Sequence, residues 1–149
     1  MTSSCGWVSS SVGLRVRPYR LADEEAVVAL WQSCGLVVEQ NDPRRDIANK
    51  LAFQPELLLV GVLEERLVGS VMAGYEGHRG WINYLAVDPA FRSHSLGRQL
   101  MEAAEAALQR LGCPKVNLQV RSGNGAVIAF YEGLGYRVEE RVGMGKRLS

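Results

Sequence analysis

The sequence predicts an α/β domain with a mixed, mostly antiparallel central sheet of about seven strands flanked by four helices. Three observations support this prediction: seven short segments have strand-like apolar patterns, four segments repeat apolar residues at helical spacing, and glycine, proline or aspartate separates them. Their order is strand, two helices, three strands, helix, strand, helix and two strands. That order indicates antiparallel pairs at the start and a βαβ crossover around the third helix.

The strands are predicted from alternation or from short apolar runs. The first alternates apolar with basic residues, the second and third form a hairpin around Glu64-Glu65-Arg66, and the fourth stops where Asp88-Pro89 ends its apolar run. The last three alternate again. The expected strands are residues 14–19, 57–63, 67–75, 81–87, 115–120, 136–141 and 144–148.

The helices are predicted from capping residues followed by apolar stripes. Asp23 precedes a stripe that ends at Cys34, and Asp42 with Pro43 starts a short helix that ends near Gln54. The third helix is expected to begin near Ser95 and to stop at Gly112, and Asn124 opens the fourth. Strands and helices therefore alternate without a linker or an internal repeat.

A link of small and basic residues, Arg92-Ser93-His94-Ser95-Leu96-Gly97-Arg98, joins the fourth strand to the third helix. Small side chains let backbone amides approach an anion, and the two arginines and the helix dipole add positive charge. The pattern indicates a pyrophosphate site and hence a nucleotide-derived cofactor. Ordinary strand-to-helix loops with serine caps have the same composition, so the residues alone leave both interpretations open.

This segment resembles the acetyl-coenzyme A signature of the GNAT superfamily of N-acetyltransferases, in which Ala-Val-x-Pro ends a strand and Arg-x-x-Gly-x-Gly or Ala follows. Ala86-Val87-Asp88-Pro89 matches the first part, and Arg92, Leu96 and Gly97 match the second, whereas Ser93 and Ser95 stand where glycines are usual. The resemblance implies that acetyl-coenzyme A is bound by the main chain of Leu85, Ala86 and Val87 and by Arg92, Ser93, Ser95, Leu96, Gly97 and Arg98.

A second segment, Asn124 to Tyr136, resembles the C-terminal signature of the same superfamily. Asn124 also fits a simple helix cap and Tyr131 a core tyrosine. The resemblance implies instead that Asn124 helps to hold the pantetheine arm and that Tyr131 protonates the leaving thiolate. It implies a single GNAT domain over residues 14–149, after a flexible leader of residues 1–13.

Composition excludes several other functions. A chain of 149 residues with 47% hydrophobic residues and a net charge of +1 fits one domain, has no apolar run of membrane-spanning length and lacks the basic stripe of a nucleic-acid-binding protein. The three cysteines and two histidines have no metal-ligand spacing. We therefore expect a cytoplasmic, metal-free protein with no membrane or nucleic-acid partner, and a homodimer is allowed.

The general base is the least defined part of the predicted site. The chain also resembles the ribosomal-protein alanine acetyltransferase branch, but Gln119 stands where that branch has a glutamate. Glu76 and His78, in a glycine-rich loop, are the catalytic candidates alongside Tyr131, with Tyr84 and Asp88 as further candidates. The loop also fits a solvated hairpin turn.

The resemblance implies transfer of an acetyl group from acetyl-coenzyme A to a primary amine, on a small molecule or a protein, by direct attack in a ternary complex. Together, Asn41-Asp42-Pro43 and residues 77–80 resemble a small bacterial GNAT subgroup, and in this fold the first two helices usually wall the acceptor side. One alternative is a GNAT-fold sensor or scaffold that binds acyl-coenzyme A without turnover, suggested by Ser93, Ser95 and Gln119. Another is a phosphate binder outside the superfamily.

Overall fold

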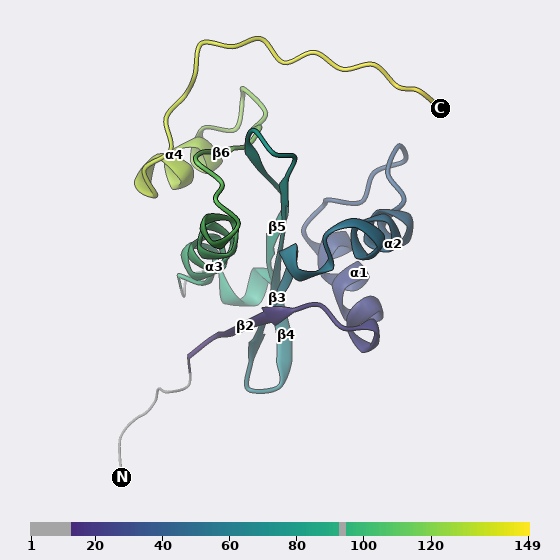
Figure 1. Cartoon of the computed structure of the whole chain (residues 1–149). Coiled ribbons are helices and arrows are strands. Elements are labelled where there is room, and N and C mark those ends of the chain that lie inside the picture. The colour runs from purple at the N-terminus through teal and green to yellow at the C-terminus, as the bar shows by residue number, and fades with distance from the viewer. Residues whose placement is uncertain (1–12, 93–94) are drawn as a thin grey trace. The chain divides into compact units, whose positions relative to one another are not determined.

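The computed structural model describes residues 13–92 and 95–149, which fall into two compact units divided between Leu118 and Gln119. The first unit contains a five-stranded sheet in the order β2-β3-β4-β5-β6 (Figure 1). Its strands are β2 (Arg15–Pro18), β3 (Leu58–Leu63), β4 (Arg66–Tyr75), β5 (Gly80–Val87) and β6 (Val116–Asn117). Successive strands from β2 to β5 pair antiparallel and β6 pairs parallel with β5, so the predicted mixed, mostly antiparallel sheet is confirmed.

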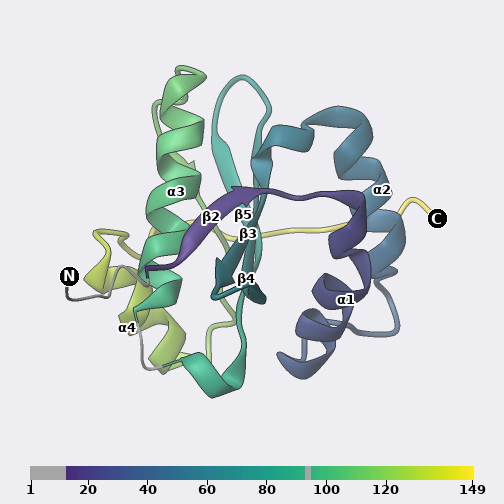
Figure 2. The ribbon, with the colours of Figure 1, turned by 90° about the horizontal axis from the view of Figure 1, so that it is seen from below.

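Three helices cover the two faces of this sheet. Figure 2 shows α1 (Glu24–Ser33) and α2 (Pro43–Phe53) on one face and α3 (Leu96–Arg110) on the other. Short 3-10 turns occur at η1 (Leu21–Asp23), η2 (Pro55–Leu57) and η3 (Pro89–Phe91). The fourth predicted helix, α4 (Gly125–Gly133), belongs to the second unit.

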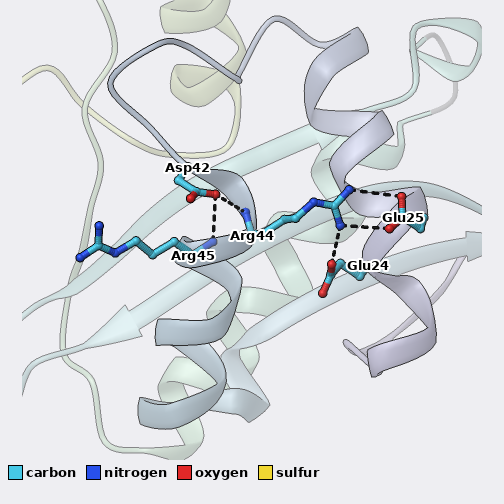
Figure 3. Close-up of polar contacts among 5 residues, drawn as sticks. All are labelled: Glu24, Glu25, Asp42, Arg44 and Arg45. Carbon is cyan, nitrogen blue, oxygen red and sulfur yellow. Dashed lines mark hydrogen bonds and ion pairs between the residues drawn. The ribbon is translucent and has the colours of Figure 1, made fainter.

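The predicted capping residue of α2 is confirmed. One carboxylate oxygen of Asp42 accepts the backbone N–H groups of Arg44 and Arg45, at 3.1 and 3.2 Å, and Pro43 occupies the first helical position (Figure 3). The Arg44 side chain reaches α1 and pairs with Glu24 and Glu25, whereas Arg45 extends in the opposite direction. The same helix start therefore fixes the backbone of α2 and ties it to α1.

A bulge interrupts the pairing of β4 with β5. Ser70 lies opposite Ala86, but Met72 lies opposite Asn83, so β5 has one residue more than β4 between these pairs. Tyr84, inside the bulge, has a left-handed backbone with φ of 53°. On its other edge, β5 pairs with β6 only from Gly80 to Trp81, which leaves the later residues of β5 without β6 pairing.

The expectation of about seven strands is wrong. Residues 136–141 and 144–148 form no strand, and the expected strand at 115–120 shortens to β6. Alternation predicts a half-buried strand only when a neighbouring edge accepts its hydrogen bonds, and here Val138 and Leu148 are 75% and 92% exposed. The chain after α4 runs extended and forms no strand (Figure 1).

Candidate functional site

A cavity of about 590 Å³ opens on the face of the first unit that carries α1 and α2. Its walls are α2 and the segment before it, and its floor is formed by β4 and β5. The lining residues are Leu36, Asn41, Asp46, Asn49, Lys50, Phe53, Met72, Asn83 and Tyr84. The volume is typical of a small-molecule site, and the polar lining can orient a polar ligand.

The bulge residue Tyr84 is held in place by two buried side chains. The Trp31 ring stacks on the Tyr84 ring at 3.8 Å with an interplanar angle of 10°. The Trp31 indole N–H donates to the Ser70 hydroxyl at 2.8 Å, and that hydroxyl donates to the Tyr84 carbonyl oxygen at 2.9 Å. Because a left-handed backbone costs a non-glycine residue about 1–2 kcal/mol, these contacts must offset the strain.

The Tyr84 side chain ends on α2. Its hydroxyl donates to the Asp46 carboxylate at 2.5 Å. Burial, the hydrogen bond to Asp46 and the charge of that carboxylate raise the pKa of Tyr84, in that order of importance. Tyr84 is therefore a protonated donor at neutral pH, and Asp46 faces the cavity with one oxygen engaged.

One helical turn further along α2, Lys50 lines the same cavity. The residue is 9% exposed, and its Nζ donates to Gln54 Oε1 at 3.2 Å and lies 5.8 Å from the centre of the Phe53 ring. Burial lowers the pKa of Lys50, partly opposed by Glu56. Among the described residues, no carboxylate forms an ion pair with this ammonium.

Glu76 and His78 lie in the exposed turn between β4 and β5 and do not line the cavity. The Glu76 carboxylate accepts the backbone N–H groups of His78, at 2.7 Å, and of Arg79. These two bonds lower the pKa of Glu76. Asp88 caps η3 by accepting the Ala90 N–H at 2.9 Å. Both carboxylates thus have structural partners in turns.

The predicted cofactor segment includes the end of β5 and the start of α3, whereas Ser93 and its neighbour His94 lie outside the described residues. Leu85, Ala86 and Val87 end β5, and the Arg92 Nε donates to the Val87 carbonyl at 3.2 Å. Ser95 precedes α3 with φ of 60° and makes no side-chain capping bond, while Leu96, Gly97 and Arg98 form the first turn. Ser95 therefore has the backbone conformation that favours glycine.

Asn124 and Tyr131 lie in the second unit. Asn124 caps α4 by accepting the Val127 N–H at 3.2 Å. The Tyr131 ring makes edge contacts with Phe130 and Tyr136, at centroid distances of 5.0 and 5.7 Å. Burial raises the pKa of Tyr131, so its hydroxyl keeps its proton at neutral pH.

Sequence reasoning missed Asp46, Lys50 and the Trp31–Ser70 support, although it placed the acceptor side at the first two helices. Asp46 and Lys50 are four residues apart, a spacing typical of solvent-exposed pairs on a helix. One signal in the sequence could have indicated their burial. Both residues lie near the apolar Ile47 on a helix whose start is well defined by Asp42 and Pro43. Within the described residues, no cluster of acidic, histidine or cysteine side chains could hold a metal, and no helix is long and apolar enough to cross a membrane.

Comparisons with known proteins identify this architecture. Residues 24–136 match the model of the Acetyltransferase (GNAT) family. An acetyltransferase of Yersinia enterocolitica is 44% identical over 135 residues, which cover 91% of this chain and 96% of that relative. The chain belongs to the GNAT family and is an acyl-coenzyme A-dependent N-acyltransferase.

Solved structures share the fold at lower identity. Ard1 from Thermoplasma volcanium has a TM-score of 0.76 and 24% identity, over 85% of this chain and 84% of the other. The PaiA N-acetyltransferase from Thermoplasma acidophilum, solved in complex with coenzyme A, has a TM-score of 0.72 and 17% identity, over 88% and 94% of the two chains. At these identities the likeness extends to the fold.

Proposed function

We propose that this enzyme transfers the acetyl group of acetyl-coenzyme A to a primary amine by direct attack in a ternary complex. The observation that carries the proposal is the cavity beside the β5 bulge. Tyr84 lines this cavity, and the next three residues of β5 are the ones assigned to the cofactor by motif. An amine in the cavity would therefore lie next to the thioester.

The cofactor side of the proposal rests on the edge of β5 and the start of α3. Beyond Trp81 the β5 edge is not used by β6, so its backbone groups can bind the pantetheine arm and the thioester carbonyl oxygen. The N–H groups of the first turn of α3 suit the pyrophosphate, and the left-handed Ser95 adopts the conformation of the usual glycine. These features support the assignment of Leu85 to Val87, Arg92 and residues 95–98.

The chemistry requires a neutral amine, an acceptor for its proton and an acid for the thiolate. The amine nitrogen attacks the thioester carbonyl carbon, the C–S bond breaks, and the sulfur leaves with a proton from the Tyr131 hydroxyl. An α-amino group with a pKa of about 7.8 is neutral in roughly a tenth of molecules at pH 7, whereas a lysine amine is neutral in under about one in a thousand. Glu76 and His78 remain the proposed proton acceptors, through solvent in the exposed turn.

The test is release of free thiol from acetyl-coenzyme A over a panel of amines, alongside calorimetry of acetyl-coenzyme A binding. We expect both binding and turnover. Tight binding without turnover on any amine would replace the proposal with the sensor or scaffold function. A carboxylate at Gly97 would repel the pyrophosphate, so Gly97→Glu should abolish coenzyme A binding in a folded protein, and unchanged affinity would refute the loop assignment.

A further inference from the structure

Two opposite charges on α2 face the same cavity. Asp46 and Lys50 are one turn apart, a rise of about 6 Å along the helix, and both line the cavity floored by β4 and β5. An acceptor without an anionic group would interact with the Asp46 carboxylate and leave the Lys50 ammonium without a counter-charge. A buried ammonium without an ion pair is costly unless a ligand supplies the counter-charge.

The positions of the two charges give the cavity a direction. Asp46 bonds to Tyr84, which directly precedes the cofactor segment of β5. Lys50 lies over Gly74, because a Cβ added to Gly74 would be 3.4 Å from the Lys50 Nζ. Gly74 pairs with Trp81, which precedes Tyr84 by three residues in β5. The carboxylate therefore marks the end of the cavity near the cofactor segment, and the ammonium marks the far end.

The protein contacts of each charge leave room for a ligand. The Asp46 carboxylate accepts from Tyr84 at Oδ2, so its other oxygen, Oδ1, can accept from an amino group. Lys50 uses one of its three N–H donors on Gln54. Gln54 itself is fixed by Tyr75, because it accepts the Tyr75 N–H at 3.1 Å and donates to the Tyr75 carbonyl at 3.0 Å.

We infer that the acceptor is a small molecule that carries an anionic group close to its primary amine, with the amine at Asp46 and the anion at Lys50. The inference rests on the proposed acetyl transfer and specifies its substrate class. A carboxylate or a phosphate satisfies the same contact. The cavity volume of about 590 Å³ lies within the range of small-molecule sites and favours a small molecule over a protein acceptor.

The test compares matched acceptors with and without the anion, and kcat/KM is expressed per neutral amine because the anion also raises the pKa of the amine. L-amino acids are assayed against their α-amides, and O-phosphoethanolamine against ethanolamine, with kcat and KM measured for each. In at least one of the two pairs, the wild-type enzyme should have a higher kcat/KM for the anionic acceptor than for its neutral counterpart. The pair that shows this preference identifies the anion bound at Lys50 as a carboxylate or a phosphate. Acetylation of peptide N-termini in preference to every anionic small molecule would overturn the inference.

Variants of Lys50 separate a binding role from a structural one. Lys50→Met should reduce the anionic-to-neutral ratio of kcat/KM by about 10- to 100-fold, mainly through KM, because a charged hydrogen bond is lost from bound substrate and transition state alike. Lys50→Arg should restore part of the ratio. Arg45→Met removes an exposed cation from the same helix and should leave the ratio unchanged.

Different outcomes distinguish this inference from the proposed function. Turnover with an equal ratio in wild type and Lys50→Met would refute the anion site while acetyl transfer stands. If no amine is turned over, calorimetry with the same L-amino acids and O-phosphoethanolamine decides: binding that Lys50→Met weakens supports the anion site alone, and no binding refutes it.

Discussion

Two tyrosines, one in each unit, hold their protons for different reasons. The pKa of Tyr84 is raised by burial and by its hydrogen bond to Asp46, whereas burial alone raises the pKa of Tyr131. The Tyr84 proton is engaged with a carboxylate, but within the described part of the chain the Tyr131 hydroxyl donates to no acceptor. A proton that is engaged positions its partner, and one that is free can be donated to a leaving group.

The comparison is tested most strongly by Tyr131→Phe. Loss of the proposed general acid should lower kcat by about 10- to 1000-fold with little change in acetyl-coenzyme A affinity, since the proton moves mainly in the transition state. Steady-state kinetics where chemistry limits the rate, together with calorimetry, measure both effects. Wild-type turnover would return Tyr131 to a packing role.

Tyr84→Phe is the matched variant and should have the smaller catalytic effect. It removes the donor to Asp46 and should lower the free energy of unfolding by about 1–2 kcal/mol, with kcat changed less than about tenfold. Denaturant unfolding and kinetics check this. Tyr75→Phe, which removes an exposed 3.4 Å contact to the Gly77 carbonyl, is the control and should be nearly neutral. A kcat loss larger than that of Tyr131→Phe would reverse the two assignments.

The contribution of the Tyr84 hydroxyl to the free energy of unfolding should decrease at alkaline pH. Its folded pKa lies above the unfolded value of about 10, so its contribution to stability is complete below pH 10 and is lost as the pH rises towards the folded pKa. Unfolding free energy measured upward from pH 9 should therefore fall more steeply in wild type than in Tyr84→Phe. Parallel curves would show that the hydroxyl contributes nothing.

Ser95 provides a reference for the backbone of Tyr84, because both have left-handed φ values but only Tyr84 is supported by buried partners. Ser95 makes no capping bond, so Ser95→Gly should stabilise the protein by up to about 1 kcal/mol and leave coenzyme A affinity equal or tighter. Thermal unfolding and calorimetry measure the two. The exposed Ser122→Gly should not stabilise. Weaker coenzyme A binding in Ser95→Gly would assign the hydroxyl a role in the loop.

Local motifs could be predicted from the sequence, because their physics is contained in a few adjacent residues. The caps Asp42 and Asn124 and the strand end at Asp88 are of this kind. The Tyr84 bulge was not predictable, since it depends on which residue of β4 lies opposite. The two C-terminal strands were wrong for a related reason, because alternation does not say whether a partner edge exists.

The charged residues of the cavity were not predicted from the sequence either, because the sequence does not say which strands pack against α2. Asp46 and Lys50 look like an exposed pair until β4 and the bulge of β5 are placed against α2. The predicted roles of Glu76 and His78 rested on residue type, and the structure adds that the Glu76 carboxylate closes its own turn. Tertiary placement thus decided which polar residues line the cavity.

The side chain of Gln54 also forms hydrogen bonds with β4 beyond the point where the pairing of β4 with β3 ends. The ladder with β3 ends at Met72, and three residues later the Gln54 amide both donates to and accepts from the backbone of Tyr75, as an adjacent strand would. An unpaired strand edge is a template on which another chain can add itself. Because the Gln54 side chain occupies the backbone hydrogen-bonding groups of Tyr75, the last residue of β4, it discourages the addition of another chain at this edge, beside the cavity.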